Sequence, residues 1–103
     1  MTRFFLDVSS HQGAIDWAQV AAWRGPSGER IEGVVARCVT EIGTIDLRYR
    51  QYLAGARKAG LWTGSYLFLS ADAVKAQTAA CIEAVGDPRG QLVMVDSETG
   101  HAT

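Results

Sequence analysis

The sequence has little of what marks several large classes of protein. It contains two cysteines and two prolines among 103 residues, and its formal net charge is −1. Nucleic-acid-binding domains carry a basic surface that neutralises phosphates, so this near balance argues against DNA or RNA as a partner. No apolar run approaches the ~18–20 residues that a membrane-spanning helix needs. We therefore expect neither a nucleic-acid partner nor a membrane span.

Signals for export, metal binding and nucleotide binding are also missing. Asp7 interrupts the first apolar run after residues 4–6, whereas a secretory signal peptide needs an apolar region of ~7–15 residues. Cys38 and Cys81 form no CxxC pair, and no histidine stands near them at ligand spacing. The glycines form no GxGxxG loop, and a P-loop lysine is absent. We expect a protein made in the cytoplasm, with two buried free thiols, no metal and no cofactor.

Four apolar runs rich in β-branched and aromatic residues are present. They cover residues 4–9, 33–39, 63–69 and 91–96, and such residues favour β-strands. The runs start about 30 residues apart, which is the size of one βα unit. Near-continuous apolar runs favour strands that are buried on both faces. The order β-α-β-α-β-α-β predicts an α/β domain with parallel strands, in either an open sheet or a closed barrel.

Three helical patterns lie between these runs. Asp16 is expected to cap the first helix and Asp46 the second. The third helix is expected to begin after Ser70 or Asp72 and to end at Gly86. The expected apolar faces are Tyr49, Tyr52, Leu53, Ala56 and Gly60 in the second helix, and Val74, Thr78, Cys81, Ile82 and Val85 in the third. Gly60 is also the expected stop of the second helix. Core packing, rather than stacking on sugars, is the expectation for the tryptophans Trp17, Trp23 and Trp62.

Acidic residues follow two of the predicted strands. Asp7 ends the first, and Asp96 and Glu98 end the fourth, which is the end of a parallel sheet where α/β proteins carry their chemistry. Alternate residues of a strand share a face at ~6.5–7 Å between Cα atoms. Two close carboxyl groups acquire different pKa values, as the acid and base of a glycosidase require. The alternative, solvated acidic residues at strand ends, stays open at this point.

Several segments together resemble glycoside hydrolase family 25, the lysozymes that cut peptidoglycan between N-acetylmuramic acid and N-acetylglucosamine. The segments are residues 7–13, 15–17, 40–41, 59–66 and 95–98. Each is modest alone, but their order and gaps make the resemblance specific. Leu67 departs from the pattern, since the family has a histidine after the tyrosine of the third strand.

The resemblance implies roles for individual residues. Glu98 would be the general acid, and Asp96 would stabilise the transition state, either by direct attack or by orienting the N-acetyl group of the substrate. Asp7 would tune their charges or hold a sugar hydroxyl. The implied substrate-binding residues are Tyr66, Glu41 and Gln12. The reaction requires neither a metal nor a cofactor.

The resemblance also implies an irregular barrel of the TIM type. The family domain is longer than this chain, so residues 1–103 are expected to be a catalytic domain truncated after the Asp-x-Glu strand. It would hold the first four strands and three helices of the barrel. Such a half barrel has an open edge with unpaired backbone groups. We therefore expect self-association or pairing with a complementary fragment.

Three functions remain in competition. The first is a peptidoglycan-cleaving lysozyme that lyses bacterial cell walls, as a phage endolysin made in its host would. The second is an inactive half barrel that serves as a wall-binding or virion module, or one half of a split lysozyme. The third is an unrelated four-stranded open α/β domain with a ligand at its strand ends.

Overall fold

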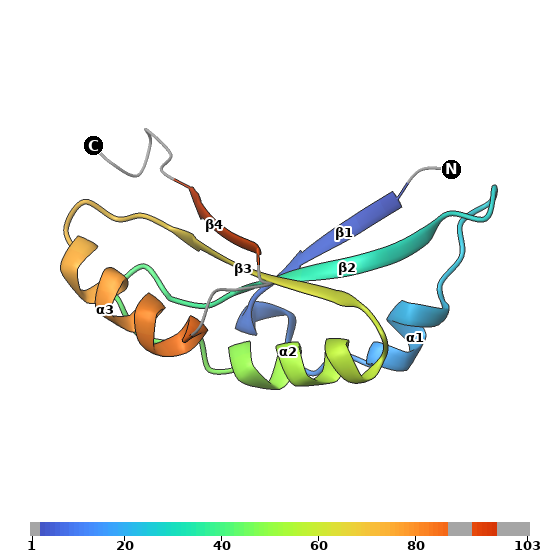
Figure 1. The fold of residues 1–103 in the computed structure, drawn as a ribbon, viewed down its shortest axis with the longest axis horizontal. Coiled ribbons are helices and arrows are strands. Elements are labelled where there is room, and N and C mark those ends of the chain that lie inside the picture. Colours follow the sequence, from blue (N-terminus) through green and yellow to red (C-terminus); the bar gives the residue numbers. More distant parts are fainter. Residues whose placement is uncertain (1–2, 87–91, 97–103) are drawn as a thin grey trace.

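Four parallel strands form one sheet in the computed structural model, which describes residues 3–86 and 92–96 (Figure 1). The elements, in chain order, are β1 (Arg3–Val8), a 3-10 turn η1 (Ser10–Gln12), α1 (Trp17–Ala22), β2 (Arg30–Arg37), α2 (Tyr49–Lys58), β3 (Trp62–Phe68), α3 (Val74–Val85) and β4 (Leu92–Asp96). The strand order is β1-β2-β3-β4, and every pair is parallel. The predicted α/β class and its four strands are confirmed. The described strands form an open sheet, and barrel closure stays a prediction.

All three helices lie on one side of the sheet (Figure 1). The strand residues that face them alternate along each strand and form the core with α2. Its buried members include Val8, Val34, Ala36, Cys38 and Leu67 from the sheet and Tyr49, Tyr52, Leu53 and Ala56 from α2. None of the described helices is long and apolar enough to cross a membrane.

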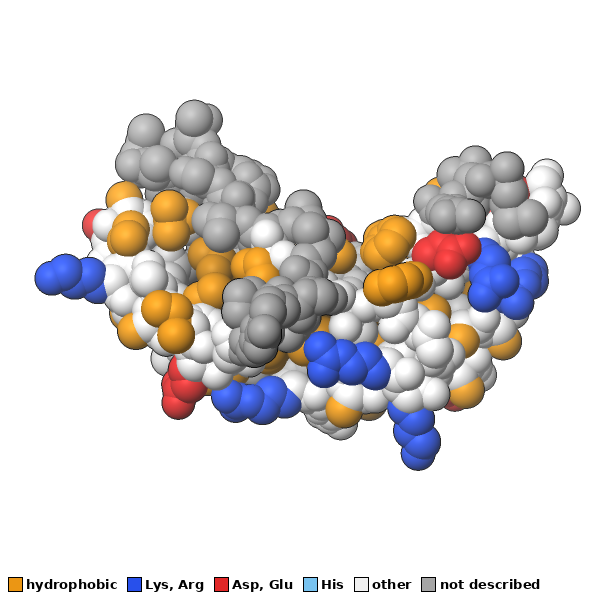
Figure 2. Space-filling view, in the orientation of Figure 1, with side chains coloured by type: hydrophobic (Ala, Val, Ile, Leu, Met, Phe, Trp, Pro, Cys, Tyr) orange, Lys and Arg blue, Asp and Glu red, His pale blue; other side chains and the backbone are white. Residues whose placement is uncertain are grey.

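The opposite side of the sheet, which we call the open face, exposes large apolar side chains. A register shift after Phe4 sets Phe5 opposite Gly33, and a Cβ on Gly33 would come within 2.4 Å of the Phe5 ring. Phe5 is 54% exposed and Trp62 is 70% exposed. Hydrophobic side chains reach the surface on this hollowed upper side (Figure 2). The expected burial on both faces holds for the centre of β2, where Val34 and Val35 point to opposite faces and are both buried. It is wrong for Phe5 and Trp62.

The start of α1 and the C-terminal ends of α2 and α3 follow the sequence signals. The Asp16 side chain accepts a hydrogen bond from the Gln19 amide at 3.1 Å and caps α1. The buried residues of α2 are Tyr49, Tyr52, Leu53 and Ala56, which are four of the five residues predicted for its apolar face. Gly60 follows the C-cap of α2 with a φ of 84°, a conformation that favours glycine. Gly86, with a φ of 66°, ends α3 as expected.

Two cap predictions are wrong. Arg48, not Asp46, occupies the N-cap of α2, and Asp46 instead accepts a hydrogen bond from the Arg48 amide at 3.0 Å. Ala73, and neither Ser70 nor Asp72, occupies the N-cap of α3. The Asp46 carboxylate has tertiary partners in Ser10 and Arg37, and these override the local capping signal. At α3, the Ser70 amide donates to the Gln77 side chain of the same helix.

The face that α3 buries also differs from the prediction. Its buried residues are Gln77 and Ala80, whereas Val74 is 41% exposed and Ile82 is 68% exposed. The helix is rotated so that the Gln77 amide reaches backbone groups at the ends of two strands. Buried backbone groups must be hydrogen-bonded, and the apolar pattern of the helix does not reveal that Gln77 fills this need.

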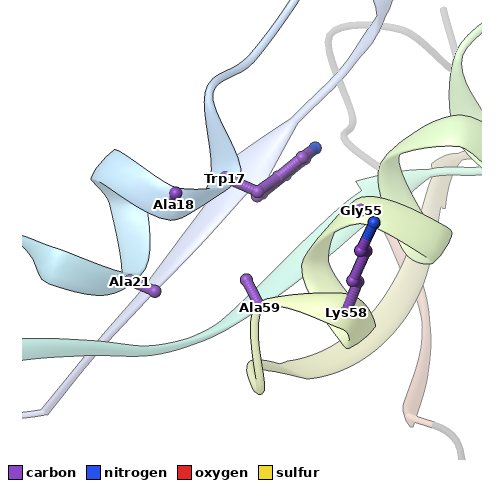
Figure 3. A pocket seen from close by; sticks show the side chains of 6 residues that line it. All are labelled: Trp17, Ala18, Ala21, Gly55, Lys58 and Ala59. Carbon is purple, nitrogen blue, oxygen red and sulfur yellow. The ribbon is translucent and has the colours of Figure 1, made fainter.

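The tryptophans divide into packed and exposed positions. Trp17 stacks edge to face on Tyr52, with ring centroids 5.7 Å apart, and a Cβ on Gly55 would come within 2.3 Å of Trp17 Cδ1. Core packing is thus confirmed for Trp17 and wrong for Trp62, on the open face. Trp17 and Lys58 border a cavity of about 470 Å³ between α1 and α2, which is otherwise lined by Ala18, Ala21, Gly55 and Ala59 (Figure 3).

Both cysteines are free thiols, as predicted. Cys38 is fully buried and its Sγ donates a hydrogen bond to the Tyr66 carbonyl oxygen at 3.3 Å, whereas Cys81 is half-buried. Burial, together with the neighbouring Cys81 thiol, raises the pKa of Cys38 to about 12. Cys38 therefore stays protonated at neutral pH and behaves as a small core residue.

Candidate active site

The C-terminal edge of the sheet gathers several residues with polar side chains. Asp7 pairs in register with Val35, and Arg37 with Tyr66. Paired residues of neighbouring strands, and alternate residues of one strand, share a face. Asp7, Arg37 and Tyr66 therefore stand together on the open face, opposite the helices.

The predicted catalytic carboxylates are only partly described. Asp7 is exposed at the end of β1. Asp96, whose backbone alone is described, is the last residue of β4 and pairs in register with Phe68. Glu98 lies outside the described residues. The geometry of the Asp96–Glu98 pair therefore stays a prediction, as do the catalytic roles of all three residues.

Tyr66 is half-buried beside Asp7. Its ring stacks edge to face on Phe68, with centroids 5.6 Å apart. Burial raises the pKa of Tyr66 above its ordinary value of 10.0, and the negative charge of Asp7 raises it further. The Tyr66 phenol is consequently neutral at physiological pH and keeps a proton that can be donated to a sugar hydroxyl.

An ion pair between Arg37 and Asp46 ties this edge together. Arg37 Nη2 lies 2.8 Å and Nε 2.9 Å from Asp46 Oδ2, and the Asp46 side chain is 0% exposed. The Ser10 amide donates to the same oxygen at 3.2 Å, and the Arg48 amide donates to Oδ1 at 3.0 Å. One carboxylate thus joins the loop after β1, the end of β2 and the start of α2.

Burial and hydrogen bonding act on Asp46 in opposite directions. Burial alone would raise its pKa, but hydrogen bonds from the Arg48 and Ser10 amides and from Arg37 lower the pKa below its ordinary value of 3.8. Asp46 is therefore a fixed negative charge that neutralises Arg37. Sequence reasoning assigned Asp46 to a helix cap and did not single out Arg37. An arginine inside the apolar run of residues 33–39 was the available signal.

Gln12 has a structural contact of its own. Its Oε1 accepts hydrogen bonds from the Ser9 amide at 2.6 Å and from the Ser9 hydroxyl at 3.3 Å, which makes a capping box for η1. The Tyr52 hydroxyl lies within hydrogen-bonding reach of the Ser9 and Gly13 carbonyl oxygens. The loop after β1 is thus well anchored, and substrate binding by Gln12 stays a prediction.

Glu41 is exposed in the loop that follows β2 and lies between two cavities. The first, of about 270 Å³, is also lined by His11, Arg37, Thr40, Ile42 and Thr44. The second, of about 80 Å³, is also lined by Phe68, Leu69 and Ser70. The loop is closed by a hydrogen bond of 2.7 Å from the Thr40 amide to the Thr44 carbonyl oxygen. Substrate binding by Glu41 stays a prediction.

Comparison with known proteins decides the family. The model of the family described as "Glycosyl hydrolases family 25" matches residues 6–103. This chain belongs to glycosyl hydrolase family 25. No curated protein and no solved structure gives a significant match. The family 25 match makes the chain a member of a glycosidase family, whose substrates are glycans.

The described residues of this family 25 chain offer groups suited to a glycan. The edge combines a carboxylate at Asp7, a neutral phenol at Tyr66 and an exposed carboxylate at Glu41. Carboxylates accept hydrogen bonds from sugar hydroxyls, and the phenol donates one. Asp7 and Tyr66 belong to strands of the sheet, and the loop of Glu41 is held by the hydrogen bond from Gln77 to the Thr40 carbonyl oxygen. These groups therefore need little ordering when a sugar binds.

Proposed function

We propose that this chain hydrolyses the β-1,4 bond between N-acetylmuramic acid and N-acetylglucosamine in peptidoglycan. One observation carries the proposal. In a chain of a glycosidase family, the strand-end carboxylates Asp7 and Asp96 belong to the first and fourth strands of one parallel sheet, at the same end. That end is where parallel α/β enzymes carry their catalytic residues.

The proposed mechanism divides the work between carboxyl groups. Glu98 protonates the oxygen of the leaving sugar, and Asp96 stabilises the oxocarbenium-like transition state or orients the substrate's N-acetyl group. Asp7 holds a sugar hydroxyl or tunes the charges of the other two. The resemblance of residues 95–98 to the family motif supports the first two roles. The exposure of Asp7 beside Tyr66 supports the third.

The proposed glycan groove runs over the strand ends. Tyr66, Glu41 and Gln12 line it. Their positions near the end of β3, in the loop after β2 and in η1 after β1 would let one glycan strand contact all three. The neutral phenol of Tyr66 donates to a sugar hydroxyl, and Glu41 accepts from one.

The open face is proposed to become the inside of a TIM-like barrel. The inner face of such a barrel is filled by packed side chains, which agrees with the apolar Phe5 and Trp62 on this face. Further strands would cover them, contributed by additional chain, by a complementary fragment or by a second copy. Cell-wall lysis of the endolysin type is proposed as the biological setting.

A product analysis tests the proposed bond. Purified peptidoglycan is digested with the protein, and the new reducing ends are reduced with borohydride and identified by mass spectrometry. The proposal expects reduced N-acetylmuramic acid at the new ends. Reduced N-acetylglucosamine would assign a different bond, and release of peptides without new reducing ends would reject glycosidase action on this polymer.

A non-catalytic glycan-binding module is the second candidate. The exposed Phe5 and Trp62 favour it, because aromatic rings on a surface can stack on sugars. This candidate expects the protein to sediment with purified walls while releasing no new reducing ends.

A further inference from the structure

Gln77 is a polar side chain in a fully buried position of α3. It is 0% exposed, and both ends of its amide are hydrogen-bonded. Its Oε1 accepts from the Ser70 amide at 2.8 Å, and its Nε2 donates to the Phe68 carbonyl oxygen at 2.8 Å and to the Thr40 carbonyl oxygen at 3.1 Å. Both amide protons and one lone pair are therefore used.

The partners of Gln77 belong to two different strand ends. Phe68 is the last residue of β3 and pairs in register with Asp96, and Ser70 follows it by two residues. Thr40 directly precedes Glu41 in the loop after β2. One side chain from a helix thus joins the C-terminal ends of β2 and β3.

The loop after β2 rests closely on α3. Gly43 has a φ of 89°, and a Cβ at this position would come within 2.4 Å of the Ala76 Cβ. The close approach at Gly43 and the hydrogen bond from Gln77 to Thr40 fix the loop at two points. Glu41 lies between these points.

The cavity of about 80 Å³ lies between the two strand ends that Gln77 joins. Its walls are Glu41 on one side and Phe68, Leu69 and Ser70 on the other. Gln77 holds the backbone next to each wall, through Thr40 and through Phe68 and Ser70. The width of the cavity therefore depends on the hydrogen bonds of the Gln77 side chain.

We propose that Gln77 is a positioning residue, which sets the distance between Glu41 and the end of β3 and thereby the affinity for a glycan strand that passes over this edge of the sheet. The effect on substrate rests on the proposed function, whereas the effect on the two loops does not. Gln77 touches no reacting atom, so its loss changes binding more than chemistry.

Hydrogen exchange tests whether Gln77 positions the loop after β2 and the end of β3, and it does not require enzymatic activity. Gln77→Met keeps the length of the side chain but removes its hydrogen bonds. We expect faster exchange of the Ser70 amide and of the Thr44 amide in the loop after β2, with unchanged exchange in α2. Gln51→Met, at an exposed position of α2, is the matched control. Unchanged protection at both Ser70 and Thr44 would overturn the proposal.

A second variant keeps the test decisive if Gln77→Met does not fold. Gln77→Glu retains an acceptor for the Ser70 amide but has at most one proton to donate, so it loses at least one of the bonds to Thr40 and Phe68. We expect exchange to accelerate more at Thr44 than at Ser70. If the Thr44 amide of Gln77→Glu exchanges as slowly as in wild type, the proposal is also overturned.

Kinetics with soluble peptidoglycan strands test the effect on substrate. Gln77→Met should raise KM by about tenfold and change kcat by less than about twofold. Glu41→Gln alone should also raise KM, and the double variant should be little worse than either single variant, because Gln77 acts through Glu41. If the free-energy effects of the two substitutions on KM are additive, or if kcat falls while KM is unchanged, the proposed effect of Gln77 on substrate binding is overturned. If the wild type cleaves no peptidoglycan, the proposed function fails, while the exchange result still decides the positioning.

Discussion

Arg37 and Asp46 form a salt bridge, with 2.8 Å between Nη2 and Oδ2, at the C-terminal edge of the sheet. Only 14% of the Arg37 side chain and 0% of the Asp46 side chain are exposed to solvent. Asp46 also holds the Ser10 amide, so the same pair fixes the loop that follows Asp7. A buried ion pair thus stabilises the edge of the sheet where the candidate catalytic residues lie.

Removing the charge of Asp46 should destabilise the fold. Asp46→Asn keeps the shape of the side chain but leaves the guanidinium of Arg37 without its counter-ion in a largely buried place. We expect the free energy of unfolding to fall by on the order of 3 kcal/mol, as for other broken buried ion pairs. Urea unfolding followed by circular dichroism measures the change, with Asp72→Asn, at an exposed position, as the control. Equal losses in both variants would contradict this account of the pair.

The lowered pKa of Asp46 couples folding to acid. The folded protein binds this proton more weakly than the unfolded chain, in which the pKa is near 3.8. The stabilising contribution of Asp46 is therefore complete above 3.8 and is lost as the pH falls through the lower pKa of the folded state. Urea titrations at a series of acidic pH values should give a steeper loss of stability in wild type than in Asp46→Asn. Parallel curves for the two proteins would show that another group causes the loss.

Gly55 should be a position where alanine destabilises a helix. Alanine normally stabilises a helix interior relative to glycine. Here the added Cβ would come within 2.3 Å of Trp17 Cδ1, and the indole is packed on Tyr52. We expect Gly55→Ala to lower the free energy of unfolding by about 1–3 kcal/mol, the usual range for overpacking.

The Trp17→Ala background is the control for this prediction. Without the indole, Gly55→Ala should be neutral or stabilising, because only the helix propensity of alanine remains. The two values come from the same urea unfolding measurement. A destabilisation that is equally large in both backgrounds would rule out the contact with Trp17 as its cause.

The two thiols should differ in reactivity. The thiolate is the reactive form, and the pKa of Cys38 is raised to about 12 by burial and by the neighbouring Cys81. Treatment of the folded protein with iodoacetamide at mildly alkaline pH should modify Cys81 first, and Cys38 only after unfolding in urea. Mass spectrometry of tryptic peptides reports the order. Modification of Cys38 ahead of Cys81 in the folded state would contradict its described burial.

Local signals in the sequence predicted much of the fold. The four strands, the cap at Asp16 and the stops at Gly60 and Gly86 depend on neighbours within a few residues, so a pattern reveals them. Asp46 and Gln77 were misread or missed because their partners, Arg37 for the first and Thr40 and Phe68 for the second, lie 9 or more residues away. Their polar character resembles that of surface residues until the tertiary contacts are known.

The candidate site was predictable to a smaller extent. The position of Asp7 near the C-terminal end of the first strand followed from the end of the apolar run, and β1, which ends at Val8, confirms it. The exposure of Trp62 was not predictable, since an aromatic residue at the start of a strand carries no sign of which face it occupies or of what covers that face. The roles of Asp96 and Glu98 stay predictions.

The assignment of Glu98 as the general acid is the central claim, and a substitution tests it most directly. Purified bacterial walls are incubated with wild type, Glu98→Gln and the control Glu83→Gln, which lies on the exposed side of α3, and new reducing ends are counted. The account predicts that wild type and Glu83→Gln release reducing ends at similar rates, and that Glu98→Gln, with an unchanged circular dichroism spectrum, releases none. Release by Glu98→Gln at the wild-type rate would contradict it.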